Sequence, residues 1–273
     1  MFQKKAHRTQ ASTIISILEL IYHASVNQIR KTHRNALFSI GVNMLQMITF
    51  VLSFYVMFEL LGLRGAAIRG DFLLYIMSGI FLYMTHIKTM GAVAGSGDPT
   101  APMMKHAPMN TAVTIGAAAI SSLYIQVLSL TLILFVYDVA FTPFTIEEPI
   151  PAFGMLLVAW FTGIAVGIVM LAIKPWFPTF VSVFTQIYQR ANMIASGKMF
   201  VANTLPGYMV AMFDWNPLFH AIDQCRGFVF INYTPRNSSI EYPIYVGIAL
   251  IMIGLMGEFY TRRHASLSWG AKR

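Results

Sequence analysis

Long apolar runs dominate the pattern of this chain. The runs cover about residues 36–61, 72–91, 112–137, 152–173, 178–200 and 242–260. A helix of about 20 mostly apolar residues crosses the hydrocarbon core of a bilayer, which is roughly 30 Å thick. The pattern therefore predicts an all-α polytopic membrane protein with six transmembrane helices, folded as one domain over residues 1–273.

A different pattern precedes the first run, within residues 1–35. Between Ser12 and Arg34 the polar residues recur every three or four positions, at Ser16, Glu19, His23, Asn27, Arg30 and Arg34. Apolar residues, among them Leu18, Ile21 and Tyr22, occupy the positions between them. This spacing predicts an amphipathic helix in the membrane interface, serving as an anchor or as a collar held by a cytoplasmic partner.

Residues 201–230, between the last two runs, are apolar but short and interrupted. A helix over 214–230 would reach about 25 Å, less than the hydrocarbon core, and would place the basic C-terminal tail outside. We therefore expect a re-entrant helix pair, in which 201–213 enters, 214–217 turns and 218–230 returns. The alternative is a helix lying flat on the outer surface. Non-helical backbone at membrane depth must be buried in protein or line a wet cavity, so the pair predicts a pathway or its gate.

Charge supports this topology. Only 11% of the residues are charged, against about 25% in soluble domains. With six spans and a cytoplasmic N-terminus, 13 basic and three acidic residues lie inside, and six basic and eight acidic residues lie outside. This asymmetry is typical of inner-membrane proteins and places both termini, including the tail 261–273, in the cytoplasm. It also explains the net charge of +8 without nucleic acid.

Catalytic motifs are absent from the sequence. It contains no GxxxxGK[ST] phosphate loop, HExxH, CxxC or GxSxG, and no two of its seven histidines are spaced as a metal pair. The single cysteine, Cys225, has no partner for an internal disulfide. We expect no catalytic residue, no metal and no bound cofactor. Gly163 and Gly167 form a GxxxG pair, which predicts close helix packing.

Arg190 is the one charge deep within a run. A mid-bilayer arginine is costly and faces a cavity, a partner or the interface. Ser182 and Gln186 add a polar side to the same segment. Arg190 either lines an aqueous path for an anion or reaches toward the outer interface.

The loop 92–110 is the one sizeable cytoplasmic connection between spans. Asp98 and Pro99 read as the cap and first turn of a short helix, and Gly95 allows the chain to turn. An ordinary loop is the alternative.

One segment carries a family resemblance. Met199-Phe200, Leu205-Pro206 and Trp215-Asn216-Pro217-Leu218-x-His220 precede the last run. This segment is similar to the capsular-polysaccharide export permeases, the membrane subunits of type-2 ABC exporters of polysaccharides and polyol phosphates. About 30 residues match closely, and the layout of the whole chain agrees. The N-terminal helix carries no matching motif, and Asp98-Pro99 has no clear counterpart.

The resemblance implies a function and its partners. Two copies of the chain would join two copies of an ABC ATPase, which binds the ATP and Mg²⁺. They would move a lipid-linked acidic capsular polysaccharide across a bacterial inner membrane, toward a periplasmic co-polymerase and an outer-membrane channel. Alternatives are a type-2 exporter of O-antigen, teichoic acid or a drug, then a secondary transporter or channel, then a membrane-embedded enzyme.

The predicted site residues fall into three groups. Basic residues on the outer half, with aromatic rings that would stack on sugars or form an interfacial belt, predict a substrate path over Arg64, Arg69, Tyr188, Arg190, Lys198 and Phe200. The predicted gate consists of Trp215, Asn216, Pro217, His220 and Arg226. The predicted contact with the ATPase consists of Gly95, Asp98, Pro99, Met104 and Lys105.

Overall fold

A computed structural model describes residues 10–32, 36–62, 68, 70–97 and 111–264. Within these residues the chain is helical and contains no strand. The helices are α1 (Gln10–Thr32), α2 (Ala36–Leu60), α3 (Phe72–Ala94), α4 (Thr111–Ala140), α5 (Pro149–Ile173), α6 (Pro178–Ala195), α7 (Gly207–Phe213), α8 (Pro217–Val229) and α9 (Glu241–His264). A short 3-10 helix, Ala202–Thr204, lies between α6 and α7.

Five of the described helices are long and apolar enough to cross a membrane, namely α2, α3, α4, α5 and α9. They coincide with five of the six predicted runs, so the prediction of a multi-pass helical membrane protein is confirmed. The remaining run forms α6, whose 18 residues extend about 27 Å but are too polar to join the other five. A sixth span therefore stays a prediction.

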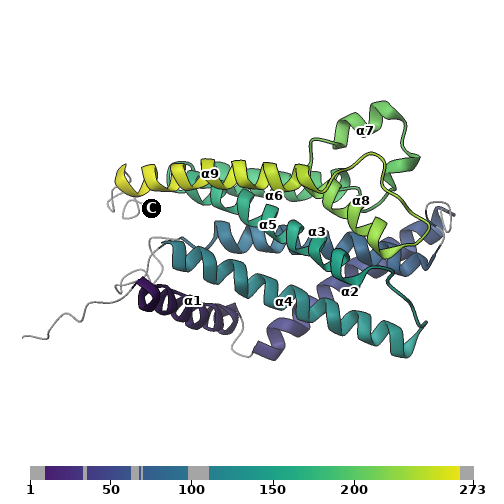
Figure 1. Cartoon of the computed structure of the whole chain (residues 1–273), viewed down its shortest axis with the longest axis horizontal. Helices are drawn as coiled ribbons and strands as arrows, with labels where there is room; N and C mark the ends of the chain where they lie inside the picture. The colour runs from purple at the N-terminus through teal and green to yellow at the C-terminus, as the bar shows by residue number, and fades with distance from the viewer. Residues whose placement is uncertain (1–9, 33–35, 63–67, 69, 98–110, 265–273) are drawn as a thin grey trace, which may run out of the picture.

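The long helices run back and forth along one direction (Figure 1). Helix α1 and the C-terminal end of α9 lie at one end of the bundle, which we call the α1 end. Helices α7 and α8 lie at the opposite end, which we call the α8 end.

Helix α3 is the centre of the bundle and packs closely on α5. Most of its surface is buried, and small residues let the two backbones approach. A Cβ on Gly163 would lie 2.6 Å from the carbonyl oxygen of His86, and one on Gly167 would lie 2.9 Å from that of Met90. The packing role predicted for this glycine pair is confirmed.

Helix α1 packs across the start of α4. Ile21 and Ala24 contact the stretch around Gly116, where a Cβ would lie 3.4 Å from Ile21 Cδ1. Leu18 and Tyr22, predicted on the same apolar side as Ile21, are exposed instead. The predicted helix is confirmed, but only some of its apolar residues pack on α4, and the others are exposed. The apolar side of α1 is wider than the surface that contacts α4.

Candidate functional site at the junction of α6 and α8

Helix α6 stops inside the bundle, before the α8 end. The chain that follows it passes against α3, where a Cβ on Gly79 would lie 2.9 Å from Lys198 Cα. Gly79 is seven residues into α3, or about 10 Å from the start of that helix. The non-helical backbone after α6 therefore lies roughly 10 Å inside the bundle.

Arg226 of α8 supplies the hydrogen-bond donors that this backbone needs. Its Nη1 donates to the carbonyls of Gly197 at 2.8 Å and Phe200 at 2.7 Å, and its Nη2 donates to that of Lys198 at 2.7 Å. The side chain is 1% exposed, and its guanidinium carbon lies 4.2 Å from the ring centroid of Tyr75. Arg226, a predicted gate residue, thus connects the end of α6 to α8 and α3.

Lys198 points into a closed cage of aromatic rings. Its Nζ lies 3.7 Å from the ring centroid of Tyr83, 4.7 Å from that of Phe54 and 5.3 Å from that of Phe50. The residue is 3% exposed, and its amine has no hydrogen-bond partner. Cation–π attraction replaces the missing acceptors. Within one protomer Lys198 does not face an open path, so the path role predicted for it requires a movement of α2 or α3.

Asn216 forms the turn between α7 and α8. Its side-chain oxygen accepts a hydrogen bond from the backbone N–H of Leu218 at 3.1 Å and so caps α8, whose first residue is Pro217. Its amide nitrogen donates to Asn192 Oδ1 at 2.9 Å and to the carbonyl of Ala195 at 3.0 Å. The reversal falls where the sequence predicts it, and it is tied to the last turn of α6.

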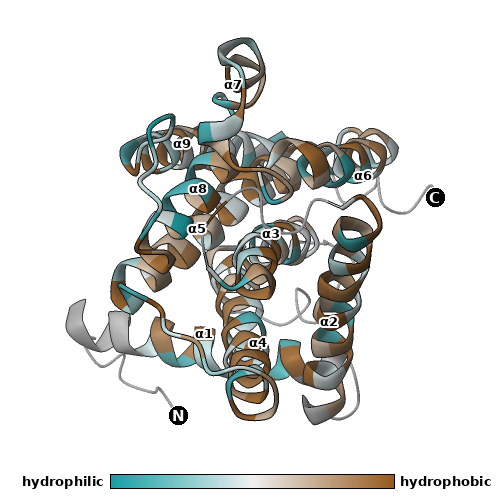
Figure 2. Cartoon of the chain, turned by 90° about the vertical axis from the view of Figure 1, so that its right-hand side faces the viewer, coloured by the Kyte–Doolittle hydropathy of each residue, from teal (hydrophilic) through white to brown (hydrophobic). Residues whose placement is uncertain are grey.

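The two halves of the predicted re-entrant pair differ. Helix α8 has ten of its 13 residues buried against the bundle, whereas α7 has none. Figures 1 and 2 show α7 standing out from the other helices. The sequence predicts that 201–213 enters and 218–230 returns, but only the returning half packs inside the protein, because its small and apolar residues fit between α3 and α5.

His220 joins the turn to the start of α9. Its Nδ1 accepts a hydrogen bond from the backbone N–H of Ser239 at 3.0 Å, so its Nε2 carries the proton and donates to the carbonyl of Asp214 at 2.6 Å. The ring centroid of Tyr242 lies 4.6 Å from that of His220, and the Tyr242 hydroxyl donates to the carbonyl of Trp215 at 2.8 Å. The Trp215 side chain itself is exposed, and its ring N–H donates to the carbonyl of Met212 at 2.7 Å.

Asp223 holds the loop between α8 and α9 and was missed by sequence reasoning. Its carboxylate is buried and accepts hydrogen bonds from the hydroxyls of Tyr233 and, at 2.6 Å, Ser238. Burial raises the pKa of Tyr233, and the Asp223 carboxylate raises it further. An acid inside an apolar helix, followed ten residues later by a tyrosine, was the signal available in the sequence.

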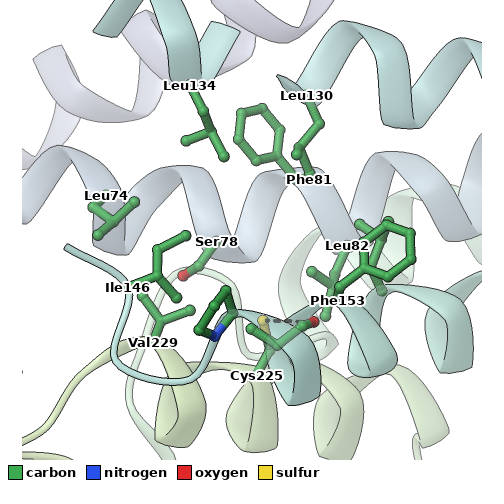
Figure 3. Close-up of a pocket in the computed structure, with 13 residues that line it drawn as sticks. Leu74, Ser78, Phe81, Leu82, Leu130, Leu134, Ile146, Phe153, Cys225 and Val229 are labelled. Carbon is green, nitrogen blue, oxygen red and sulfur yellow. Dashed lines mark hydrogen bonds between the residues drawn. The ribbon is translucent and has the colours of Figure 1, made fainter. Parts of the chain in front are cut away.

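An apolar cavity of about 160 Å³ lies between α3, α4, α5 and α8 (Figure 3). Leu74, Phe81 and Phe153 line it, and Cys225 lies at its edge with Sγ 3.8 Å from the Ala152 carbonyl oxygen. Nothing in this lining suits catalysis. The cavity leaves α8 loosely packed on one side.

Helix α6 carries a polar stripe on the outside of the helix bundle. Ser182, Gln186 and Arg190 follow at intervals of four, so they share one face, and all three are exposed. Tyr188 lies on the inner side, where its hydroxyl is 2.9 Å from Nε2 of the fully buried His86. Arg190 is therefore free to meet a ligand or a partner, whereas Tyr188 serves as a link between α6 and α3.

Of the remaining predicted residues, Phe200 and Gly95 have structural roles, and the others lie outside the described part of the chain. The Phe200 ring packs on Phe213 and Phe219, at centroid distances of 5.1 and 6.5 Å. Gly95 ends α3, with its N–H donating to the Gly91 carbonyl. The following predicted residues lie outside the described part of the chain: Arg64, Arg69, Asp98, Pro99, Met104 and Lys105.

Comparison with known proteins assigns no family. No family model matches the chain, and no curated protein matches it. Among the described residues, no three histidine, cysteine, aspartate or glutamate side chains group as a metal site.

Proposed function

We propose that this chain is the membrane-spanning half of an ATP-driven exporter in a bacterial inner membrane. Two copies would form the pathway, and a separate ABC ATPase would drive them. The cargo would be a lipid-linked acidic polysaccharide of the capsular type. The observation that carries this proposal is the exposed polar stripe of Ser182, Gln186 and Arg190 on α6.

The depth of the stripe argues against contact with lipid. Arg190 lies 12 residues into α6, or about 18 Å from its start. Arg190 is also five residues, or about 8 Å, before the end of α6 at Ala195, and α6 ends roughly 10 Å inside the bundle. Its distance from the α8 end is therefore again about 18 Å. An arginine near the centre of a bilayer costs at least about 2.5 kcal/mol when it faces lipid. Burial of the stripe against a second copy, around water, removes that cost.

A crossing α6 also gives the chain an even number of spans. This agrees with the position of α1 and the C-terminal end of α9 at the same end of the bundle. The proposal therefore includes α6 as a fifth span, with both termini cytoplasmic, and α8 with its turn as a re-entrant element on the outer side. The buried carbonyls that Arg226 satisfies are what a re-entrant segment requires.

A path lined by two copies of the stripe would select for anions. Arg190 contributes one fixed positive charge from each copy, and no acidic residue lies on α6. In a narrow channel with apolar walls, water screens such charges poorly, so they attract an acidic polymer. Trp215, which is exposed at the turn, would gate the outer end.

Cross-linking tests the dimer. In a Cys225→Ser background, Gln186→Cys should form disulfide-linked dimers in membranes, because two stripes face each other. Tyr245→Cys, at an exposed position on α9, is the matched control and should form no disulfide-linked dimer. If Tyr245→Cys cross-links and Gln186→Cys does not, the pathway cannot lie along α6.

An export assay tests the proposed cargo. The protein purified from its native membranes should retain an ABC ATPase. Arg190→Gln should lower export of an acidic glycan by about tenfold or more, the loss of one charge-assisted contact per copy, while a neutral glycan is much less affected. Equal loss of both would show that Arg190 supports the fold rather than the cargo.

A further inference from the structure

A second, polar cavity lies near the α1 end, away from the junction of α6 and α8. It has a volume of about 340 Å³ and lies between α1, α2, α3 and α4. Eight of its 12 lining residues are polar, which is unusual between helices of this apolarity. Its size is that of a small-ligand pocket, at roughly 300 Å³ or more.

Among the described residues of the lining, Lys88 is the one that carries a charge. Its Nζ donates to Gln46 Oε1 at 2.5 Å, a neutral acceptor, and none of these described lining residues is acidic. An ammonium has three donor hydrogens, so two remain for a ligand. The cavity therefore presents an uncompensated positive charge among hydrogen-bonding groups.

A buried acceptor without a partner belongs to one of the lining residues, Gln126. Gln126 donates through Nε2 to Asn43 Oδ1 at 3.2 Å, and Asn43 Nδ2 donates to Ser129 Oγ at 2.9 Å. These bonds fix the orientation of the Gln126 amide and leave its buried Oε1 without a partner. A ligand that fits carries both an anionic oxygen for Lys88 and a hydroxyl for Gln126.

The position of the cavity indicates where such a ligand comes from. Lys88 is six residues before the end of α3, or about 9 Å from the α1 end. Leu45 on α2 and Tyr124 on α4, each next to lining residues, are exposed and offer an apolar surface for acyl chains. Helix α1 borders the cavity and exposes Tyr22 on its free face.

We propose that this cavity binds the headgroup of a lipid that carries a phosphate and hydroxyls. Lys88 holds the phosphate, Gln126 accepts a hydrogen bond from a hydroxyl, and the acyl chains lie along α2 and α4. Phosphatidylglycerol of the membrane has this chemistry, and so does the phosphate and sugar of a glycan-bearing lipid. Lipid binding in this cavity does not require the proposed export function.

Lipid titration of the purified full-length protein tests the site. Short-chain phosphatidylglycerol, followed by native mass spectrometry, should bind at least tenfold more tightly than phosphatidylcholine of the same chain length. Lys88→Gln should weaken phosphatidylglycerol binding by about tenfold or more, the loss of one charge-assisted hydrogen bond, and Lys88→Arg should retain it. Lys174→Gln, which removes a positive charge at the end of α5, is the matched control and should change nothing.

Two further results decide the proposal. Gln126→Leu should weaken phosphatidylglycerol but leave phosphatidic acid, which lacks the glycerol hydroxyls, unchanged. Mass spectrometry of the lipid that the protein retains from native membranes shows whether the ligand is phosphatidylglycerol or a glycan-bearing lipid. In either case the Lys88→Gln variant should no longer retain it. Equal binding of phosphatidylcholine, equal loss in Lys174→Gln, or no retained lipid of either kind would overturn the site. A monodisperse gel-filtration peak for each variant separates loss of binding from loss of folding.

Discussion

Replacing Arg226 with methionine should open the junction of α6 and α8. The substitution keeps a flexible chain of similar length but removes both nitrogens that donate to the backbone after α6. The carbonyl of Gly197 keeps a 3.4 Å contact with the N–H of Phe200, whereas the carbonyls of Lys198 and Phe200 lose the donors at 2.7 Å. A buried carbonyl without a donor costs about 1–3 kcal/mol, so the local opening free energy should fall by about 3 kcal/mol.

The native Cys225 is a built-in reporter of this opening. It is the single cysteine of the chain, it is 4% exposed, and it precedes Arg226 in α8. A buried thiol reacts with a maleimide only when its segment opens, so the labelling rate follows the opening equilibrium. A loss of about 3 kcal/mol corresponds to labelling about 100-fold faster. Removing a nearby cation disfavours the reactive thiolate, so electrostatics alone would slow the reaction instead.

Two variants complete the experiment in nanodiscs. Arg226→Lys keeps the charge but has one nitrogen in place of the planar fork, so its labelling rate should be intermediate. Lys174→Gln removes a positive charge at the end of α5, away from the junction of α6 and α8, and should leave the rate within about twofold. Labelling of Arg226→Met at the wild-type rate would refute the view that Arg226 holds the non-helical backbone inside the bundle.

Other contacts give equally direct tests. Gly163→Ala should abolish folding or cost several kcal/mol, since its Cβ would lie 2.6 Å from a backbone oxygen of α3, whereas Gly154→Ala, with nothing within 4 Å, should be neutral; gel filtration of both variants checks this. Asn216→Ala should lower the unfolding free energy by about 1–2 kcal/mol through loss of the α8 cap, measured by thermal or denaturant unfolding, and an unchanged stability would contradict the cap. The raised pKa of Tyr233 means that its contribution to stability is fully present below the ordinary tyrosine value and is lost as pH rises above it. Stability measured between pH 8 and 11 should therefore fall less steeply in Tyr233→Phe, unless the contact with Asp223 is absent in solution.

Hydropathy alone was sufficient to predict most of the fold. Five of the predicted runs became long apolar helices, because a helix that faces apolar surroundings all round needs no pattern beyond continuous apolarity. Even the reversal before Pro217 could be placed, since a capping Asn216 followed by proline is a local signal for a helix start. A capping residue followed by proline lies within a few residues of the helix start that it determines, so it can be recognised in the sequence.

The contrast between α7 and α8 could not be read in the same way. Both segments are apolar and short, and both flank the same turn. Only α8 fits against α3 and α5, a match of shapes contributed by residues more than 60 positions away, such as Cys225 beside Ala152. The anchoring of the following loop by Asp223 also depends on a fold that brings Tyr233 back to α8.

The basic residues predicted for the outer half show most clearly what the sequence cannot tell. The sequence predicts that Arg190 and Lys198 line a path for an anion and that Arg226 belongs to its gate, because a charge in an apolar segment signals only that something must compensate it. The fold compensates each one differently: Arg226 by backbone carbonyls, Lys198 by aromatic rings, and Arg190, which is exposed, by no contact among the described residues. A charged side chain whose partners lie within the same chain stabilises the fold. Arg190 is the one of the three whose compensation must come from outside, and for that reason the proposed path runs along α6.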